Sequence, residues 1–269
     1  MMAAVRLKDA SEEALYGGKC VSLGSALRAG LPTPDGYALE VDFVAAISRG
    51  DEPAIAAVRP LFAELAPAMA VRSSAVGEDS EDASFAGQHV SILNVMNADA
   101  MVLAIEQVHD SASTPEALAY RGKMGVRDKP AIAVVLQQQI QSEVSGVMFT
   151  RHPLSAKVER YVEASWGLGE AIVAGLVVPD GFRIGNDGAI IARIAGEKDI
   201  KLVSTSSGEV EEVEVEADKV EALCLDDRQL LQLHQLASDC EAVYGQHIDI
   251  EWAFHAGNLY LLQCRAITI

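Results

Sequence analysis

The segment 247–265 constrains the fold most, because it contains two strand-like runs separated by a short turn. Side chains of a strand point alternately to its two faces, so Asp249 and Glu251 share one face. Ile250 and Trp252 then share the other. The segment therefore predicts a hairpin with one acidic face and one apolar face.

The length of the turn decides which side chains of this hairpin lie together. With a loop at 256–258, Glu251 lies opposite Gln263 on the return strand. Asp249 then lies opposite Arg265. A two-residue loop shifts the register and separates both pairs.

The polar face of this hairpin has two interpretations. Carboxylate and amide oxygens side by side, as in the pair Glu251 and Gln263, suit Mg²⁺, a hard cation that is usually shared with substrate phosphates. An arginine beside them, Arg265, suits an anion. The simpler alternative is an exposed hairpin face with ordinary cross-strand polar pairs.

Composition places the chain among ordinary globular proteins. Half of its 269 residues are apolar and 22% are charged, which excludes collagen-like and largely disordered chains. The length suits one large domain or two lobes. A net charge of −18 argues against a nucleic-acid-binding protein, so any bound phosphate has to be held by a few placed cations.

Two further features concern the compartment. No apolar stretch reaches the roughly 18 residues of a membrane span, and the N-terminus lacks a signal-peptide pattern, so we expect no membrane association. The four cysteines are dispersed, with no metal-ligand or redox spacing. Together these features predict a reduced, cytoplasmic protein.

Helix and strand signals alternate along the chain, as in α/β and α+β domains. The expected helices are 54–66, 101–109, 116–124 and 227–244, the last with Val243 on its inner side. The expected strands are 70–73, 131–139, 144–150, 160–165 and 208–222, the last with an acidic face in water. We expect 131–139 and 144–150 to be neighbouring buried strands of one sheet.

Two other segments have the composition of phosphate-binding loops. Gly17-Gly18-Lys19 opens an apolar-periodic stretch, which places backbone N–H groups and one ammonium group at the start of a helix. The segment 71–79 leads from a strand through Arg72 into small polar residues, followed by 83–88, as in a flap over phosphates. A turn with a solvated lysine and a surface loop are the simpler alternatives.

Taken in order, these motifs resemble the N-terminal ATP-binding domain of the phosphoenolpyruvate synthase and pyruvate phosphate dikinase family, which also occurs in rifampicin phosphotransferases and glucan water dikinases. The matching segments are 17–19, 30–32, 34–37, 71–74, 78–79, 83–88, 120–121, 134–140, 145–150, 163–170, 179–180, 249–252 and 262–268. The resemblance therefore covers nearly the whole chain.

The resemblance implies an α+β, ATP-grasp-like fold with two lobes and the nucleotide cleft between them. The N-terminal lobe, 1–139, would hold the glycine loop, the Arg-Ser-Ser motif and the phosphate flap, and the C-terminal lobe, 140–269, the metal-binding hairpin. The implied ATP contacts are Lys19, Arg72 and Arg265 at the phosphates, Gly87 and Ser91 in the flap, Gln137, Gln139 and Ile140 at the adenine, and Glu251 and Gln263 as Mg²⁺ ligands.

The resemblance also implies a reaction. In the family, ATP passes its β-phosphate to a histidine on a separate domain, and AMP and orthophosphate are the products. No histidine of this sequence has the matching setting, so we expect a phosphohistidine-domain protein as partner in trans. The alternatives are a stand-alone small-molecule kinase and a non-catalytic ATP-binding sensor. The sequence does not specify the final phosphate acceptor.

Overall fold

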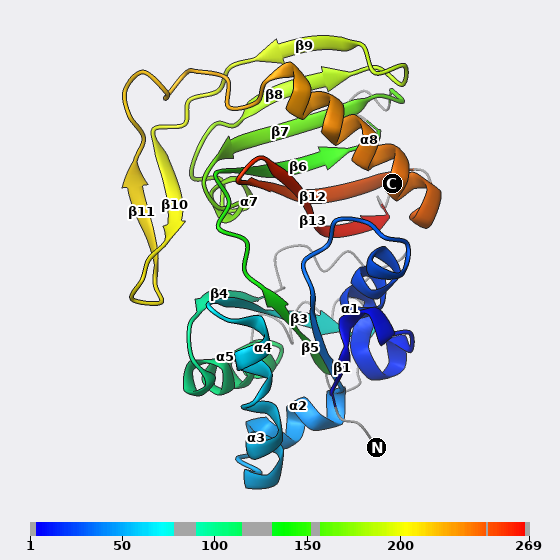
Figure 1. Cartoon of the computed structure of the whole chain (residues 1–269), viewed down its shortest axis with the longest axis vertical. Coiled ribbons are helices and arrows are strands. Elements are labelled where there is room, and N and C mark those ends of the chain that lie inside the picture. Colours follow the sequence, from blue (N-terminus) through cyan, green and yellow to red (C-terminus); the bar gives the residue numbers. More distant parts are fainter. Residues whose placement is uncertain (1–3, 78–89, 115–130, 152–156, 246, 267–269) are drawn as a thin grey trace.

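The structure is a computed structural model that describes residues 4–77, 90–114, 131–151, 157–245 and 247–266. Two antiparallel sheets form two lobes, one above the other in Figure 1. This arrangement confirms the predicted α+β class with a cleft between two lobes. No helix of the described part of the chain is long and apolar enough to cross a membrane.

The N-terminal lobe contains a five-stranded sheet in the order β1-β2-β5-β3-β4. Its strands are β1 (Ala4–Arg6), β2 (Gly36–Leu39), β3 (Met69–Ala75), β4 (Ser91–Val95) and β5 (Ile132–Gln138). Its helical segments are η1 (Leu7–Asp9), α1 (Glu13–Arg28), α2 (Val41–Ser48), α3 (Glu52–Val58), α4 (Leu61–Leu65) and α5 (Ala98–Ser111).

The two faces of this sheet are covered differently. Helices α2 and α5 pack on one face, where Val71 and Leu136 are buried. Helix α1 packs against the opposite face, where Val135 is buried. Because side chains alternate along a strand, Arg72 shares the α1 side with Val135, its partner in the sheet. Polar residues of β3 and β5 therefore reach the cleft beside α1.

The C-terminal lobe contains a six-stranded sheet in the order β13-β12-β6-β7-β8-β9. Its strands are β6 (Val144–Phe149), β7 (Arg160–Trp166), β8 (Asp180–Ile184), β9 (Ile190–Ile194), β12 (Ile248–His255) and β13 (Asn258–Ala266). The short helix α7 (Glu170–Val173) and the long helix α8 (Asp227–Tyr244) complete the lobe, and β10 (Ile200–Ser204) pairs with β11 (Val210–Glu214) in a separate hairpin.

The apolar face of the C-terminal sheet packs against α8. Ile250 and Trp252 are buried there with Leu230 and Leu233 of the helix, as the sequence alternation predicts. Helix α8 begins after a capping box formed by Asp226 and Gln229. The acidic face of the hairpin is thereby turned toward the cleft.

Several predicted elements are wrong in detail. Strands β5 and β6 belong to different sheets, because the polar segment 139–143 carries the chain from one lobe to the other. The expected helix 54–66 is two helices, α3 and α4, separated at Pro60. Val243 is 36% exposed and not on the inner face of α8. The expected helix 116–124 lies outside the described residues.

Candidate functional site

A cavity of about 570 Å³ lies between the two lobes and is lined by residues of both sheets. Nine of the residues that the sequence analysis selected line it: Lys19, Arg72, Ser91, Gln137, Gln139, Ile140, Glu251, Gln263 and Arg265. Gly87, the tenth, lies outside the described residues. Residues from distant parts of the sequence thus converge on one cavity.

The hairpin brings its polar pairs together by a route that the sequence analysis did not foresee. The loop has two residues, Ala256 and Gly257, and His255 pairs with Asn258. A bulge between β12 and β13 leaves Leu262 as an extra residue of the return strand. The bulge restores the register beyond it.

The restored register produces both predicted pairs. Glu251 lies opposite Gln263, and Asp249 lies opposite Arg265. The pairing is therefore the one expected for a three-residue loop, and the statement that a two-residue loop separates the pairs is wrong, because the bulge compensates for the shorter loop. The bulge also releases the carbonyl of Leu262, which accepts a hydrogen bond from Arg72 Nη1 at 2.8 Å.

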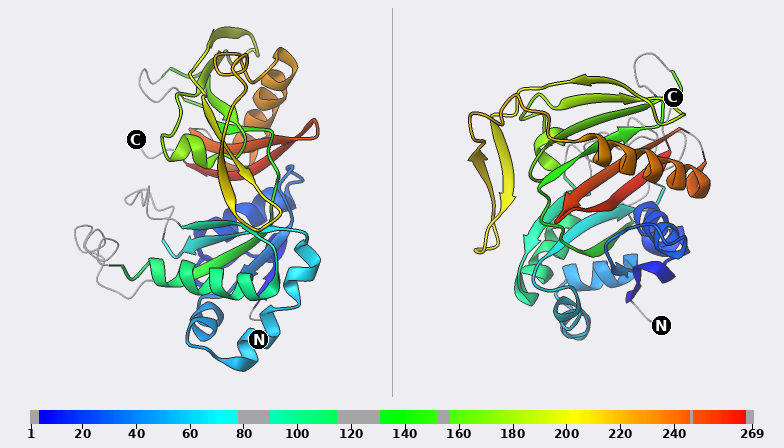
Figure 2. Two further views of the ribbon diagram at one scale, coloured as in Figure 1. Left: turned by 90° about the vertical axis from the view of Figure 1, so that its left-hand side faces the viewer. Right: turned by 45° about the horizontal axis from the view of Figure 1, so that its top comes forward.

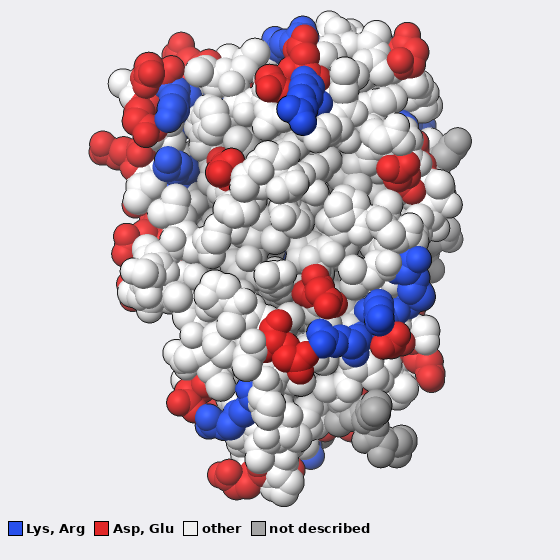
Figure 3. Space-filling view, in the orientation of Figure 1, with Lys and Arg blue, Asp and Glu red and all other residues white. Residues whose placement is uncertain are grey.

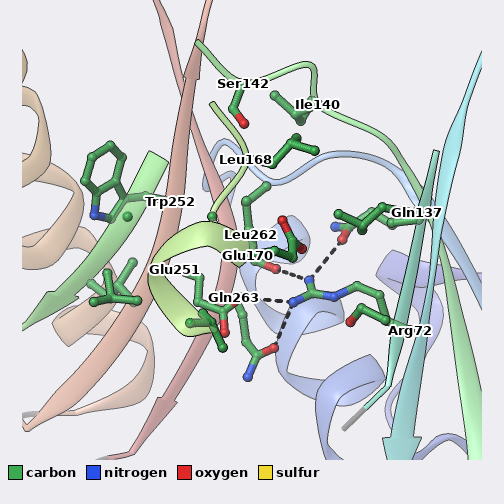
Figure 4. A pocket seen from close by; sticks show the side chains of 18 of the residues that line it. Arg72, Gln137, Ile140, Ser142, Leu168, Glu170, Glu251, Trp252, Leu262 and Gln263 are labelled. Atoms are coloured by element: carbon green, nitrogen blue, oxygen red, sulfur yellow. Dashed lines mark hydrogen bonds and ion pairs between the residues drawn. The ribbon is translucent and has the colours of Figure 1, made fainter. Parts of the chain in front are cut away.

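Arg72 of β3 is the main polar connection across the cleft, as Figure 4 shows. Its Nη2 donates to Glu251 Oε2 at 3.0 Å and to Gln263 Oε1 at 3.0 Å. The side chain of Arg72 is 11% exposed and that of Glu251 is 33% exposed, so the ion pair is partly shielded from water. One guanidinium group from the N-terminal lobe is therefore held by three groups of the C-terminal hairpin.

Arg265 forms the second ion pair of the hairpin. Its Nε donates to Asp249 Oδ2 at 2.8 Å and to Oδ1 at 3.1 Å. Both side chains line the cavity. Asp249 is thus engaged by an arginine of its own hairpin, whereas Glu251 is engaged by an arginine of the other lobe.

The glycine loop is a kink inside α1 and not a loop before it. Gly17 has a φ of 72°, and a Cβ there would lie 2.2 Å from the carbonyl oxygen of Ser74. The Ser74 hydroxyl donates to Tyr16 O at 2.8 Å and accepts from Cys20 N at 3.0 Å. Only glycine allows this close approach of α1 to β3.

The kink places Lys19 against the end of the cavity. Its Nζ donates to the carbonyl oxygen of Ser73 at 2.9 Å, and the residue is only 3% exposed. Ser73 directly follows Arg72 on β3. The ammonium group of Lys19 is therefore bound at the residue next to Arg72 on the same strand.

Two glutamines border the other end of the cavity, where the chain passes between the lobes. Gln137 Nε2 donates to Pro34 O at 3.1 Å, and its Oε1 faces Arg72. The backbone N–H of Gln139 donates to Ala68 O at 3.1 Å. Other lining residues near this passage are apolar: Ala70, Leu93, Ile140 and Leu168. Such a lining suits a flat aromatic base.

Glu170 is a lining residue that the sequence analysis did not select. It begins α7 and faces the cavity with Arg72 and Glu251 (Figure 4). Burial raises the pKa of its carboxyl group, and the negative charge of Glu251 adds to this, while its own backbone N–H and Arg72 oppose it. The sequence signal that could have pointed to Glu170 was its place at the end of the matching segment 163–170. No partner residue for it was evident from the sequence.

The oxygens of Glu251 and Gln263 suit Mg²⁺. Both accept from the same nitrogen of Arg72, so they converge on a point where a positive group lies. Among the described residues no group of three or more His, Cys, Asp or Glu could hold a metal ion. This donor set fits a cation that takes most of its ligands from phosphates and water, as Mg²⁺ does.

The fold and the cavity define a class of protein. Two α+β lobes enclose a cavity with an apolar end, three cationic side chains and a carboxylate–amide pair, which are the parts of a nucleotide-binding module. Comparison with known families agrees. Residues 52–269 match the model of the pyruvate phosphate dikinase AMP/ATP-binding domain. The chain belongs to this family.

Individual relatives support the assignment. A probable phosphoenolpyruvate synthase of Archaeoglobus fulgidus is 35% identical over 97% of this chain and 40% of its own length. A rifampicin phosphotransferase of Streptomyces sviceus is 32% identical over 97% of this chain and 35% of its own length. The chain therefore spans well under half of these relatives. A solved D-alanyl-alanine synthetase A of Vibrio cholerae aligns over 94% of this chain and 56% of its own, with 12% identity and a TM-score of 0.38.

Proposed function

We propose that the chain delivers the β-phosphate of Mg-ATP to a histidine on a separate domain or partner chain. ATP, the histidine and one water would give AMP, phosphohistidine and orthophosphate. The observation that carries the proposal is the convergence of Glu251, Gln263 and Arg72 from two lobes on one point of the cavity. The final acceptor beyond the histidine belongs to the partner.

Each end of the cavity has a role in this proposal. Lys19, Arg72 and Arg265 neutralise the triphosphate, and Gly87 and Ser91, the latter at the start of β4, would contact it. Gln137, Gln139 and Ile140 border the adenine. Glu251 and Gln263 would hold Mg²⁺, which supplies further charge neutralisation at the phosphates. Phosphoryl transfer needs little more than such positioning and charge neutralisation.

The contacts of Arg72 with the hairpin suggest a rearrangement when nucleotide and Mg²⁺ bind. Arg72 Nη2 lies where a cation bound by Glu251 and Gln263 would lie. The guanidinium group therefore has to turn away from these oxygens, and the phosphates are the anions it can turn toward. In this way the same residue can either hold the hairpin in place or bind the substrate.

Two aspects of the proposal concern organisation. The boundary between the lobes lies between residues 139 and 140, where the chain passes from β5 toward β6. The relatives are longer than this chain, which supports a histidine-bearing domain outside it. That domain would have to reach the phosphate end of the cavity, beside Lys19 and Arg265.

Product analysis tests the reaction. ATP labelled at the β-phosphate is incubated with the chain and Mg²⁺ alone, with a panel of small molecules, and with a phosphohistidine-domain protein such as that segment of a relative. We expect AMP, orthophosphate and acid-labile label on the partner only in the third mixture. ADP with a phosphorylated small molecule would show a direct kinase instead. ATP that binds but is never consumed would show a sensor.

A further inference from the structure

The β10–β11 hairpin lies outside both sheets and runs along one side of the cleft. Figure 2 shows it extending from the C-terminal lobe down to β4 of the N-terminal lobe. At the middle of β10, Leu168 N donates to Leu202 O at 2.9 Å, and Gly167 forms a bridge with the same residue. Leu168 lines the cavity, so strand β10 is bonded directly to a residue of the candidate site.

The tip of this hairpin is fastened to the other lobe by one side chain. Asn94 Nδ2 donates to Thr205 O at 2.8 Å and to Glu209 O at 2.7 Å. Asn94 is 1% exposed and has a φ of 56°. Asparagine is one of the few residues that tolerate this backbone conformation, and its amide supplies the two hydrogens that two carbonyl groups require.

Hydrogen bonds within the tip hold these two carbonyl groups close together. Thr205 Oγ1 donates to Glu209 O at 3.0 Å and accepts from Glu209 N at 3.2 Å. The backbone N–H of Thr205 also donates to Glu209 O at 2.9 Å. The two acceptors of Asn94 are therefore held in one place by the hairpin itself.

Asn94 also contacts the segment where the chain passes between the lobes. Its backbone N–H donates to Gln139 Oε1 at 3.4 Å. Gln139 lines the apolar end of the cavity, next to Ile140. A single buried residue thus connects the hairpin tip, strand β4 and the passage between β5 and β6.

We propose that Asn94 is a positioning residue that fastens the β10–β11 hairpin across the cleft and so fixes the spacing of the two lobes at the base-binding end. This inference rests on the proposed function, because it takes the ligand to be a nucleotide. When the fastening is lost, the lobes spend part of their time farther apart. Apparent affinity then falls in proportion to the fraction of molecules that keep the binding arrangement.

The test uses the full chain with Asn94→Gly, which keeps the backbone conformation and removes the amide. Thr205→Val is a second variant, from the other side of the contact. Ala256→Gly is the matched control, since Ala256 also has a positive φ, 49°, in a distant turn. The dissociation constants of ATP, AMP and adenosine are measured for each, and Arg72→Ala serves as a phosphate-end comparison.

We expect Asn94→Gly to weaken ATP, AMP and adenosine binding by one common factor, up to about tenfold, which corresponds to two hydrogen bonds. Thr205→Val should act in the same direction, and the double variant should add little. Arg72→Ala should weaken ATP far more than adenosine. A lower melting temperature of Asn94→Gly with unchanged affinities would show a purely structural role and overturn the inference.

A measurement without nucleotide separates this inference from the proposed function. Backbone hydrogen exchange at Leu168 and Gln139 should be faster in Asn94→Gly than in the unchanged chain or in Ala256→Gly, because both N–H groups are held by contacts next to the fastened hairpin. Equal exchange in all three would overturn the inference. If the unchanged chain binds no nucleotide, the proposed function fails, and exchange alone decides the role of Asn94.

Discussion

Arg72 of the N-terminal lobe makes three polar contacts with the C-terminal hairpin at the cavity. We expect Arg72→Ala to abolish ATP turnover with a partner, by a factor of about 10²–10³ or more, because a placed charge at the transferring phosphates is lost. The measurement is AMP release at saturating ATP, with circular dichroism to establish folding. Arg72→Lys is the matched variant, since it keeps the charge but cannot reach Glu251, Gln263 and Leu262 O together. Near-normal turnover of Arg72→Ala would refute the assignment of this site.

Glu170 gives a prediction for stability against pH. Its carboxyl pKa is raised in the folded chain, mainly by burial. Between the ordinary pKa and the raised pKa the unfolded chain binds fewer protons than the folded chain, so stability falls as pH rises through that window. We therefore expect Glu170→Gln to be more stable than the unchanged chain at pH 7 and equally stable below about pH 4. Urea unfolding at both pH values measures this.

Glu216 provides a control of opposite sign. Its pKa is lowered by its own backbone N–H and by Lys219, so its contribution to stability is present at neutral pH and is lost as pH falls through the lowered value. Glu216→Gln should be slightly less stable than the unchanged chain at pH 7 and equal to it in acid. If Glu170→Gln and Glu216→Gln changed stability in the same direction at pH 7, the account of Glu170 would be wrong.

At the scale of elements, the kink in α1 makes a prediction about the glycine loop. We expect Gly17→Ala to destabilise the chain by about 1–3 kcal/mol and to displace Lys19, because a Cβ there meets Ser74 O at 2.2 Å in a backbone with positive φ. Gly30→Ala is the matched control. It has a similar φ, 77°, but a Cβ there meets no atom within 4 Å. Thermal unfolding and ATP affinity are measured for both, and equal losses would show that contact with Ser74 is unimportant.

Elements with a strong repeating pattern were predictable from the sequence. The period of two in Asp249 to Trp252 placed Glu251 on the cleft face, and helix α8 has the predicted bounds. The assignment of strands to sheets was not predictable, because β5 and β6 are apolar runs that local pattern cannot distinguish. The bulge at Leu262 and the inward position of Glu170 depend on packing between the lobes. They could not be predicted from a local sequence pattern.

At the scale of the whole molecule, the chain is strongly acidic, yet its cavity collects cations. The net charge is −18, while Lys19, Arg72 and Arg265 line one cavity. On the face seen in Figure 3 acidic and basic side chains are interspersed, and a mixed row of them runs from just below the centre toward the right. We therefore expect the acidic surface to repel a polyphosphate, so that a neutralising metal ion would favour its binding.

Binding across two lobes should stabilise the whole chain, since a ligand that binds only the folded state raises the free energy of unfolding, by about 2.7 kcal/mol at one hundred times its dissociation constant. We expect ATP with Mg²⁺ to raise the melting temperature far more than ATP with EDTA. Glu251→Ala should remove the part that depends on Mg²⁺ and leave the smaller part, because the arginines and Lys19 persist. Glu212→Ala, which removes an exposed carboxylate of β11, should respond as the unchanged chain does. An undiminished Mg²⁺ effect in Glu251→Ala would show that the metal binds elsewhere. The proposed phosphate-binding point between the two lobes would then be wrong as well.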